Sequence, residues 1–269
     1  MIRSFLILLF SCLVIGTATA QQRLPGNQNI YSANTRGIIY DKELGFSLAI
    51  LSPRNIEFSV RSGKIVSFDK MKYWSLGLGN IRHSRERKIN PEDFNPQTNR
   101  ISRSYTYGKE NQLYALRFAF GTRKYISEKA KDKGVAMGYS YEFGPSLGLL
   151  KPYYIEYELQ DAAFTVIDIR HDGENTAQFL NDQGRIFGAS EWTKGLGEIG
   201  LRPGLHARAA AHFGFGAYDE VPKYLEAGLM ADFFLGETDL LIESDLTPGV
   251  KNSPLYLSLY VKVTMGKRW

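Results

Sequence analysis

The sequence predicts an all-β fold: a closed antiparallel β-barrel of eight strands that spans a membrane, with ten strands as the alternative. Three observations lead to this prediction. Eight stretches alternate between apolar and polar residues, long connections follow every second stretch, and after residue 20 no apolar run has the length of a transmembrane helix. The alternation is clearest at 255–269, where the apolar row has the same parity as Trp269. A period of two indicates a β-strand, and an unbroken apolar face suits a strand whose outer side meets lipid.

Large apolar residues form one face of each stretch, and small or charged residues form the other. We expect strands at 37–51, 55–65, 72–81, 112–124, 134–144, 204–216, 223–235 and 255–269. The face with small and charged residues suits the inside of a small barrel, because a narrow lumen crowds side chains. Eight is an even number, as bacterial barrels prefer. The count becomes ten if residues 153–169 form a hairpin in the wall.

The connections differ in length according to the side of the membrane. Long polar loops are expected near 82–111, 145–202 and 236–253, whereas the connections after the second, fourth and sixth strands are short. Long loops outside and short turns in the periplasm are typical of outer-membrane barrels, so both termini are expected in the periplasm. The tight first turn at 52–54 departs from this rule. Within 145–202 we expect strand character at 153–159 and 164–169 and a short helix at 175–182.

The start of the chain predicts export. Arg3 precedes a short apolar core, and Ala18 and Ala20 form an A-x-A cleavage signal, so residues 1–20 are expected to be a signal peptide. Residues 21–36 are polar and are expected to form a flexible periplasmic leader. A lipoprotein signal ending at Cys12 is the alternative. Cys12 is the only cysteine, so cleavage after Ala20 leaves no disulfide, thiol nucleophile or cysteine metal site.

Charged residues recur on the inward face of the predicted strands. Acidic and basic groups are nearly balanced there, and buried charges must pair or cost several kcal/mol each. We therefore expect an ion-paired network that plugs the lumen, with catalysis as the alternative. The expected members are Glu57, Arg61, Arg117, Glu142, Arg208, Glu226, Asp232 and Lys262.

Two inward histidines invite a catalytic interpretation. His206 and His212 lie about 20 Å apart along an extended strand, so they cannot share one metal, and each is expected to be a hydrogen-bonded lumen or rim residue. A Ser-His-acid hydrolase of the lipid A deacylase or phospholipase type is the alternative, and it would draw on Ser140 and on Glu142 or Glu226. No metal and no cofactor are expected.

The segment from Arg82 to Lys88 is strongly basic. We interpret it as an ordinary solvated surface, with lipopolysaccharide phosphates or an acidic partner surface as alternatives. Export excludes nucleic acid as a partner. A narrow pore is a further alternative function, although eight strands leave an interior only wide enough for side chains.

The signal peptide, alternating strands such as 134–144, and the ending Met265-Gly-Lys-Arg-Trp269 together resemble small outer-membrane β-barrel proteins of Bacteroidota, a family of largely uncharacterised function. The resemblance covers nearly the whole mature chain. It implies the barrel fold and the bacterial outer membrane as location, and it implies no reaction. Because the external loops are long, the lumen is expected to be plugged and no catalytic motif is found, we expect a structural or accessory subunit, with a secretion or outer-membrane assembly complex as the candidate assembly. The expected partners are outer-membrane lipid and lipopolysaccharide, other outer-membrane proteins, and the barrel-assembly machinery during insertion. The terminal strand resembles the signal that this machinery recognises, in which we place Leu259, Val261, Val263 and Trp269.

Overall fold

The computed structural model describes residues 40–269 except 53, 68, 93, 96–99, 127–134, 160–164, 174 and 216–218. The predicted signal peptide at 1–20 and leader at 21–36 lie outside the described residues. Among the described residues, no helix is both long and apolar enough to cross a membrane.

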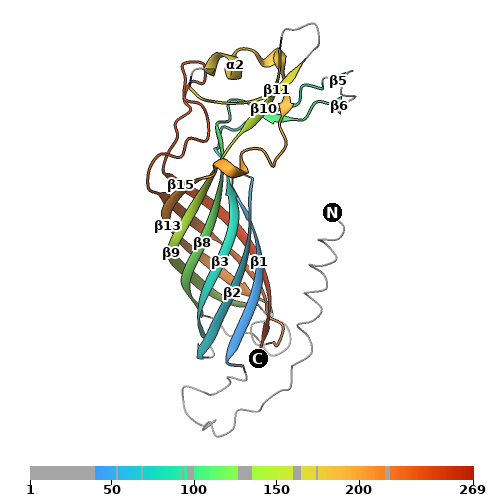
Figure 1. Ribbon diagram of the computed structural model, residues 1–269. Helices are drawn as coiled ribbons and strands as arrows, with labels where there is room; N and C mark the ends of the chain where they lie inside the picture. The colour runs from blue at the N-terminus through green and yellow to red at the C-terminus, as the bar shows by residue number, and fades with distance from the viewer. Residues whose placement is uncertain are drawn as a thin grey trace, which may run out of the picture.

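Eight strands close into one antiparallel barrel (Figure 1). They are β1 (Lys42–Leu51), β2 (Asn55–Ser67), β3 (Lys70–Ile81), β8 (Asn111–Tyr125), β9 (Ala136–Pro152), β13 (Gly200–Gly214), β14 (Lys223–Phe234) and β15 (Leu255–Arg268). Each strand pairs with its neighbours in sequence order, and β1 closes the sheet against β15 from Glu43↔Arg268 to Leu51↔Tyr260. The prediction of a closed eight-stranded antiparallel barrel is confirmed.

The outer surface of the barrel is an apolar belt to which every strand contributes. Side chains on the outward rows are exposed, whereas their neighbours on the inward rows are buried; Phe58 is 67 % exposed and Glu57 is 0 % exposed. One exposed member from each strand is Ile50, Phe58, Leu78, Phe120, Phe143, Leu205, Leu229 and Leu257. A continuous apolar belt of this kind far exceeds the patches that monomeric water-soluble proteins expose, and it suits a surface solvated by hydrocarbon.

Glycines on the inward face make room for large lumen side chains. A Cβ atom added at Gly121 would lie 2.5 Å from the Tyr73 ring, and one added at Gly79 would lie 2.9 Å from the Arg117 guanidinium. A narrow barrel can therefore hold long charged and aromatic side chains only where a neighbouring strand lacks a side chain of its own.

Strand β9 is longer than the sequence pattern indicated. It was expected to end at Gly144, but it continues to Pro152 with its alternation intact, and β13 begins at Gly200 instead of Gly204. Pro145 lacks the N–H that a sheet requires, which suggested a strand end. In the structure Pro145 faces outward opposite Leu205, and the β8–β9 pairing is interrupted only locally, between Arg117↔Ser146 and Phe120↔Phe143. The two strands extend the wall on this side of the barrel.

The three long connections fold together into a cap over one end of the barrel (Figure 1). We define the cap as the described residues of 82–110, 153–199 and 235–254. Its largest sheet has the order β11-β10-β12, and β4–β7 and β5–β6 form two small hairpin pairs. The ten-stranded alternative does not apply, because the strands within 153–169 pair in the cap and not in the wall. The cap elements are β4 (Lys88–Ile89), β5 (Phe94–Asn95), β6 (Arg100–Ile101), β7 (Tyr105–Thr106), β10 (Tyr154–Glu158), β11 (Val166–Arg170), α2 (Thr176–Leu180), η1 (Gln183–Arg185), β12 (Ile186–Ala189) and η2 (Leu196–Glu198).

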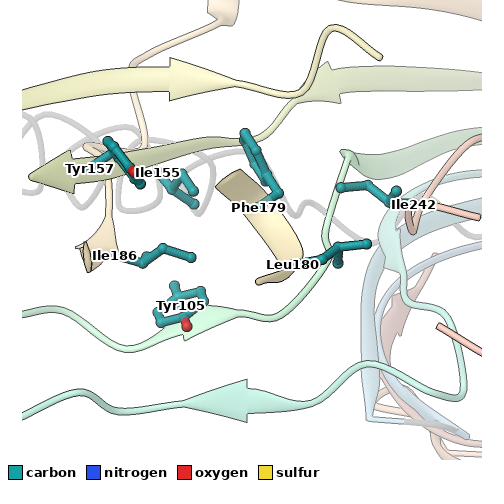
Figure 2. Packing of buried hydrophobic residues seen from close by; sticks show 7 residues of the cluster. All are labelled: Tyr105, Ile155, Tyr157, Phe179, Leu180, Ile186 and Ile242. Atoms are coloured by element: carbon teal, nitrogen blue, oxygen red, sulfur yellow. The ribbon is translucent and has the colours of Figure 1, made fainter. Parts of the chain in front are cut away.

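The cap has a hydrophobic core of its own, shown in Figure 2. All three connections contribute to it, because Tyr105 comes from the first, Ile155 and Phe179 come from the second, and Ile242 comes from the third. Backbone hydrogen bonds also join the connections: the N–H of Ile242 donates to Gly108, and that of Glu110 donates to Leu240. The cap is therefore a folded unit and not a set of independent loops. The remaining core residues are Tyr157, Leu180 and Ile186.

We predict that Phe179→Ala loosens the cap while leaving the barrel folded. Phe179 is 2 % exposed, and truncating a buried phenylalanine to alanine costs ~3–5 kcal/mol. Limited proteolysis should cleave the variant faster within the cap, while the heat-dependent mobility shift that reports a folded barrel on gels is retained. Ile101→Ala, at a position that is 71 % exposed, is the matched control and should behave like the unaltered chain. Equal cleavage rates for the Phe179 and Ile101 variants would contradict a packed cap core.

Candidate functional site

The centre of the barrel interior is a chain of ion pairs around Glu57. One oxygen of this carboxylate accepts hydrogen bonds from Arg117, at 2.6 Å, and from Arg208. Arg117 also holds Asp232 in a bidentate pair, with N–O distances of 2.7 and 2.9 Å. Arg208 reaches Glu142 at 3.0 Å. These five side chains come from five different strands, so the pairs link the wall across the lumen.

Glu226 is the centre of a second group of contacts. It accepts hydrogen bonds from Arg61 at 2.9 Å, lies 2.9 Å from the Lys262 ammonium, and lies 3.2 Å from Nδ1 of His212. Lys262 also approaches Glu142 at 4.0 Å, which connects this group to the first one. All eight residues of the expected charge network thus lie inside the barrel and in one connected set of contacts.

A third cluster lies toward the end of the barrel opposite the cap. Arg123 contacts both oxygens of Glu43 at 3.0 Å, and Arg268 donates to Glu43 at 2.9 Å. The Tyr224 hydroxyl donates to Glu43 at 2.5 Å, and the Arg123 guanidinium carbon lies 4.0 Å from the centre of the Tyr224 ring. Charge-assisted hydrogen bonds and a stacked arginine are an arrangement that allows these charges to be buried.

Sequence reasoning missed this third cluster although its signal was available. Arg123 has the same parity as Arg117 in β8, and Arg268 has the same parity as Lys262 in β15. Both residues lie at the ends of the predicted strands 112–124 and 255–269, beyond the part of each inward row that was assigned to the lumen. With these residues included, the described part of the interior holds five carboxylates and six basic side chains, all buried: Glu43, Glu57, Glu142, Glu226, Asp232, Arg61, Arg117, Arg123, Arg208, Lys262 and Arg268.

The catalytic candidates do not assemble into a nucleophilic site. Glu142 is engaged by Arg208, and His212 lies between Glu226 and the hydroxyl of Tyr125, which is 3.3 Å from its Nε2. Ser140 is buried and pairs in register with Ala210, and no hydrogen bond joins its hydroxyl to His206 or His212 among the described residues. Nδ1 of His206 has no hydrogen-bond partner among the residues that the structure describes. These side chains lie inside the barrel, whereas a lipid substrate would meet its outside.

Apolar side chains close the cap end of the lumen. Ile81, Leu113, Leu150 and Phe234 come from four strands and pack with Leu240 of the cap, and each is at most 7 % exposed. Ala115 belongs to the same cluster, and Tyr256 packs against it. The described interior is therefore filled by charged side chains along its length and by an apolar layer at the cap.

Burial shifts the pKa of two charged side chains in the cap. Burial lowers the pKa of the Lys109 ammonium, against the opposing effect of Glu86 at 3.0 Å. Burial likewise raises the pKa of the Glu110 carboxyl, while His171 at 3.6 Å acts in the opposite direction. Among the described residues, no group of three or more His, Cys, Asp or Glu side chains is arranged to hold a metal ion.

The residues expected to form the assembly signal lie on the outer surface of the closing strand. Leu259, Val261 and Val263 are on the outward row of β15, between 49 and 63 % exposed, and Trp269 is 54 % exposed. They are therefore accessible from the lipid-facing side of the barrel.

The fold and the interior together define a closed eight-stranded antiparallel barrel with an apolar outer belt and a filled, ion-paired lumen. No protein-family model matches this chain, and no curated protein matches it in sequence.

Three solved structures are similar to the chain: the N-terminal β-barrel domain of Pseudomonas aeruginosa OprF, Neisserial surface protein A, and Ail, the attachment invasion locus protein of Yersinia pestis. Their sequence identities are 8, 6 and 7 %, and their TM-scores are 0.36, 0.35 and 0.33. The matches cover 86, 85 and 85 % of this chain and 98, 95 and 97 % of those chains. The assignment of this chain as a closed β-barrel is based on its own strand pairing and not on these similarities.

We predict that Arg117→Ala destabilises the barrel strongly, because it leaves Asp232 buried without its bidentate partner and weakens the pairing of Glu57. Removing one partner of a buried pair typically costs ~3–5 kcal/mol. The neighbouring outward change Leu116→Ala is the control and should have a much smaller effect. The measurement is thermal unfolding of both variants in the same detergent.

A second substitution tests whether pairing is the cause of the loss. Adding Asp232→Asn to Arg117→Ala removes the orphaned charge and should restore part of the lost thermal midpoint, because residues in one network do not contribute additively. An Arg117→Ala midpoint equal to that of the unaltered chain would contradict a structural role for the network.

Proposed function

We propose that this chain is an integral protein of the bacterial outer membrane that acts as a structural or accessory subunit. In this proposal the cap is the surface that binds other molecules. The observation that carries this proposal is the combination of a lumen filled by paired charges with a folded cap across one end. A barrel filled in this way anchors a structure in the membrane, and the part left to contact other molecules is the cap.

The outer face of the barrel supports the membrane location. Aromatic side chains flank the apolar belt, as they do at membrane interfaces in known barrels. Tyr139 and Tyr141 stand on the outward row of β9, and Trp269 lies at the end of β15. On the cap side, Trp192 donates a hydrogen bond to the outward Tyr114 hydroxyl at 3.0 Å. Because long connections are external in such barrels, we propose that the cap lies outside the cell and Trp269 in the periplasm. We also propose that the barrel-assembly machinery inserts the chain into the membrane.

Specific observations weigh against the two alternative functions. A narrow pore needs a continuous water path, but the described lumen is crossed by the Arg117 and Arg208 pairs and closed by the layer around Phe234. A lipid hydrolase needs serine, histidine and carboxylate within hydrogen-bond reach, and Ser140 lacks this contact with either histidine.

The cap carries features that suit a protein partner. Phe94 and Ile101 are 58 and 71 % exposed on the β5–β6 pair, and Ile167 is 38 % exposed on β11. Strand β11 pairs only with β10 among the described residues, so its other edge offers backbone groups for strand addition. We propose another outer-membrane protein as the partner, in a secretion or outer-membrane assembly complex.

We predict that the purified chain does not conduct ions across planar lipid bilayers. Insertion should be verified in the same preparation by protection of the barrel from protease and by its heat-dependent gel mobility. Steady single-channel currents that scale with the amount of inserted protein would show that the lumen is open. They would contradict this prediction and support the alternative function as a pore.

We predict that Ile101→Asp releases the partner when the tagged chain is purified from its own outer membrane at native expression. The matched control is Leu246→Asp, which places the same charge at an exposed cap position outside the β5–β6 pair. Loss of the co-purifying outer-membrane protein in the Ile101 variant alone supports the accessory role. Recovery of the unaltered barrel by itself counts against this role, and recovery from the soluble periplasmic fraction counts against the membrane location.

A further inference from the structure

The rim of the barrel has a notch where its wall is lowest. The β1–β2 turn is short, and its last contact with β15 is the hydrogen bond from the Ser52 N–H to the Leu259 carbonyl. Strand β15 continues beyond this point to Leu255, whereas β3 ends at Ile81, which the β2–β3 register places opposite Asn55 at the start of β2. Beside the protruding end of β15, the wall is therefore low over the β1–β2 turn.

A cavity of about 190 Å³ lies at this notch. That volume is well above the ~10–15 Å³ needed to hold one water molecule, so the cavity can hold a larger polar group. It is lined by Asn55, Ile81, Arg82, His83, Ser84, Lys251, Ser253, Leu255, Tyr256, Leu257 and Ser258. The lining is basic and hydroxyl-rich, and it contains no carboxylate.

The two permanent cations of this lining are not engaged in ion pairs within the described part of the chain. No ion pair joins the side chain of Arg82 or Lys251 to a described carboxylate. Two acidic residues beside the cavity are held by other groups. Oε1 of Glu86 accepts hydrogen bonds from the Lys109 ammonium at 3.0 Å and from the His83 N–H at 3.2 Å, and Glu243 accepts one from the Asn252 N–H at 2.5 Å. An anion in the cavity would therefore meet two cations that form no ion pair with a described carboxylate.

The cavity is also held in shape before any ligand binds. Nε2 of His83 lies 3.2 Å from the carbonyl oxygen of Lys251, and the Arg85 guanidinium donates to the Pro248 carbonyl at 3.1 Å. These contacts join the segment that carries Arg82 to the one that carries Lys251. Preorganised donors lower the ordering cost of binding.

The side-chain oxygen of one buried lining residue lacks a hydrogen-bond partner. Asn55 is 2 % exposed, and its side-chain oxygen forms no hydrogen bond with any described residue. Buried amides normally have partners, and either end of an asparagine amide can occupy a given position. The amide can thus turn its NH₂ group toward an anion in the cavity.

We propose that this cavity binds a phosphate group, held by Arg82 and Lys251, and that its source is a phosphorylated glycolipid of the outer leaflet. Leu255 and Leu257 lie at the same opening and are 48 and 72 % exposed on the lipid-facing row. A ligand that joins a phosphate to acyl chains can fill the basic cavity and cover this apolar wall together. The choice of a lipid source rests on the proposed membrane location, whereas the phosphate site itself does not.

The test is a titration of the purified full chain in non-ionic detergent, followed by native mass spectrometry. The probes are diphosphorylated lipid A, the same lipid after removal of its phosphates, and inorganic phosphate. Arg82→Ala/Lys251→Ala should weaken lipid A binding about tenfold or more, which corresponds to at least ~1.4 kcal/mol. The matched control is Arg87→Ala/Lys88→Ala, which removes two exposed charges from the same basic segment outside the cavity and should leave the affinity within about twofold.

Each result decides a separate point. The phosphate site is contradicted if the chain binds lipid A with the same affinity with and without its phosphates. It is also contradicted if the two double variants weaken lipid A binding equally. Binding of inorganic phosphate that depends on Arg82 and Lys251, without binding of lipid A, supports the phosphate site and contradicts the lipid source.

If the double variant does not fold, Lys251→Gln on its exposed segment should weaken lipid A binding in the same direction. A chain that fractionates away from the outer membrane yet binds phosphate contradicts the proposed location and leaves the site standing.

Discussion

Burying charge in a narrow barrel requires that every charged side chain meet a partner, and this requirement shapes the whole interior. The pairs are long-range in sequence: Arg117 meets Asp232, and Arg61 meets Glu226. Such partners meet only if the strand register is correct all round the barrel, since a shift by one residue would turn these charges toward the lipid. The network therefore favours one register over others, and the third cluster links β1 to β15, where Arg268 contacts Glu43 at the closure of the sheet.

The same requirement leaves the interior poorly suited to transport or catalysis. The carboxylates Glu57, Glu142 and Glu226 are each held by cations, and His212 lies between Glu226 and Tyr125. A group held by several partners is rigid, and here it is also closed off by the apolar layer under the cap. The surfaces that remain in contact with the surroundings are the cap, the apolar outer belt and the rim between them.

The rim links the membrane-facing and solvent-facing parts of the molecule. On one side β9 and β13 extend the wall upward, and on the other side the short β1–β2 turn leaves it low. The cap connections cross this uneven edge, so Arg82 and Lys251 stand above the low wall beside Leu257. Basic residues are thereby adjacent to residues of the apolar outer row, as the proposed phosphate-glycolipid site requires.

The sequence by itself determined the barrel, because a period of two is a local property and each row can be assigned to lipid or lumen without knowing its neighbours. It also indicated eight of the inward charges for the same reason. Only the tertiary structure decided which charges meet, that Arg123 and Arg268 join them, that β9 runs through Pro145, and that three loops share a core around Phe179. Those features depend on contacts between residues far apart in the chain, and alternation along a single strand carries no information about its distant partners.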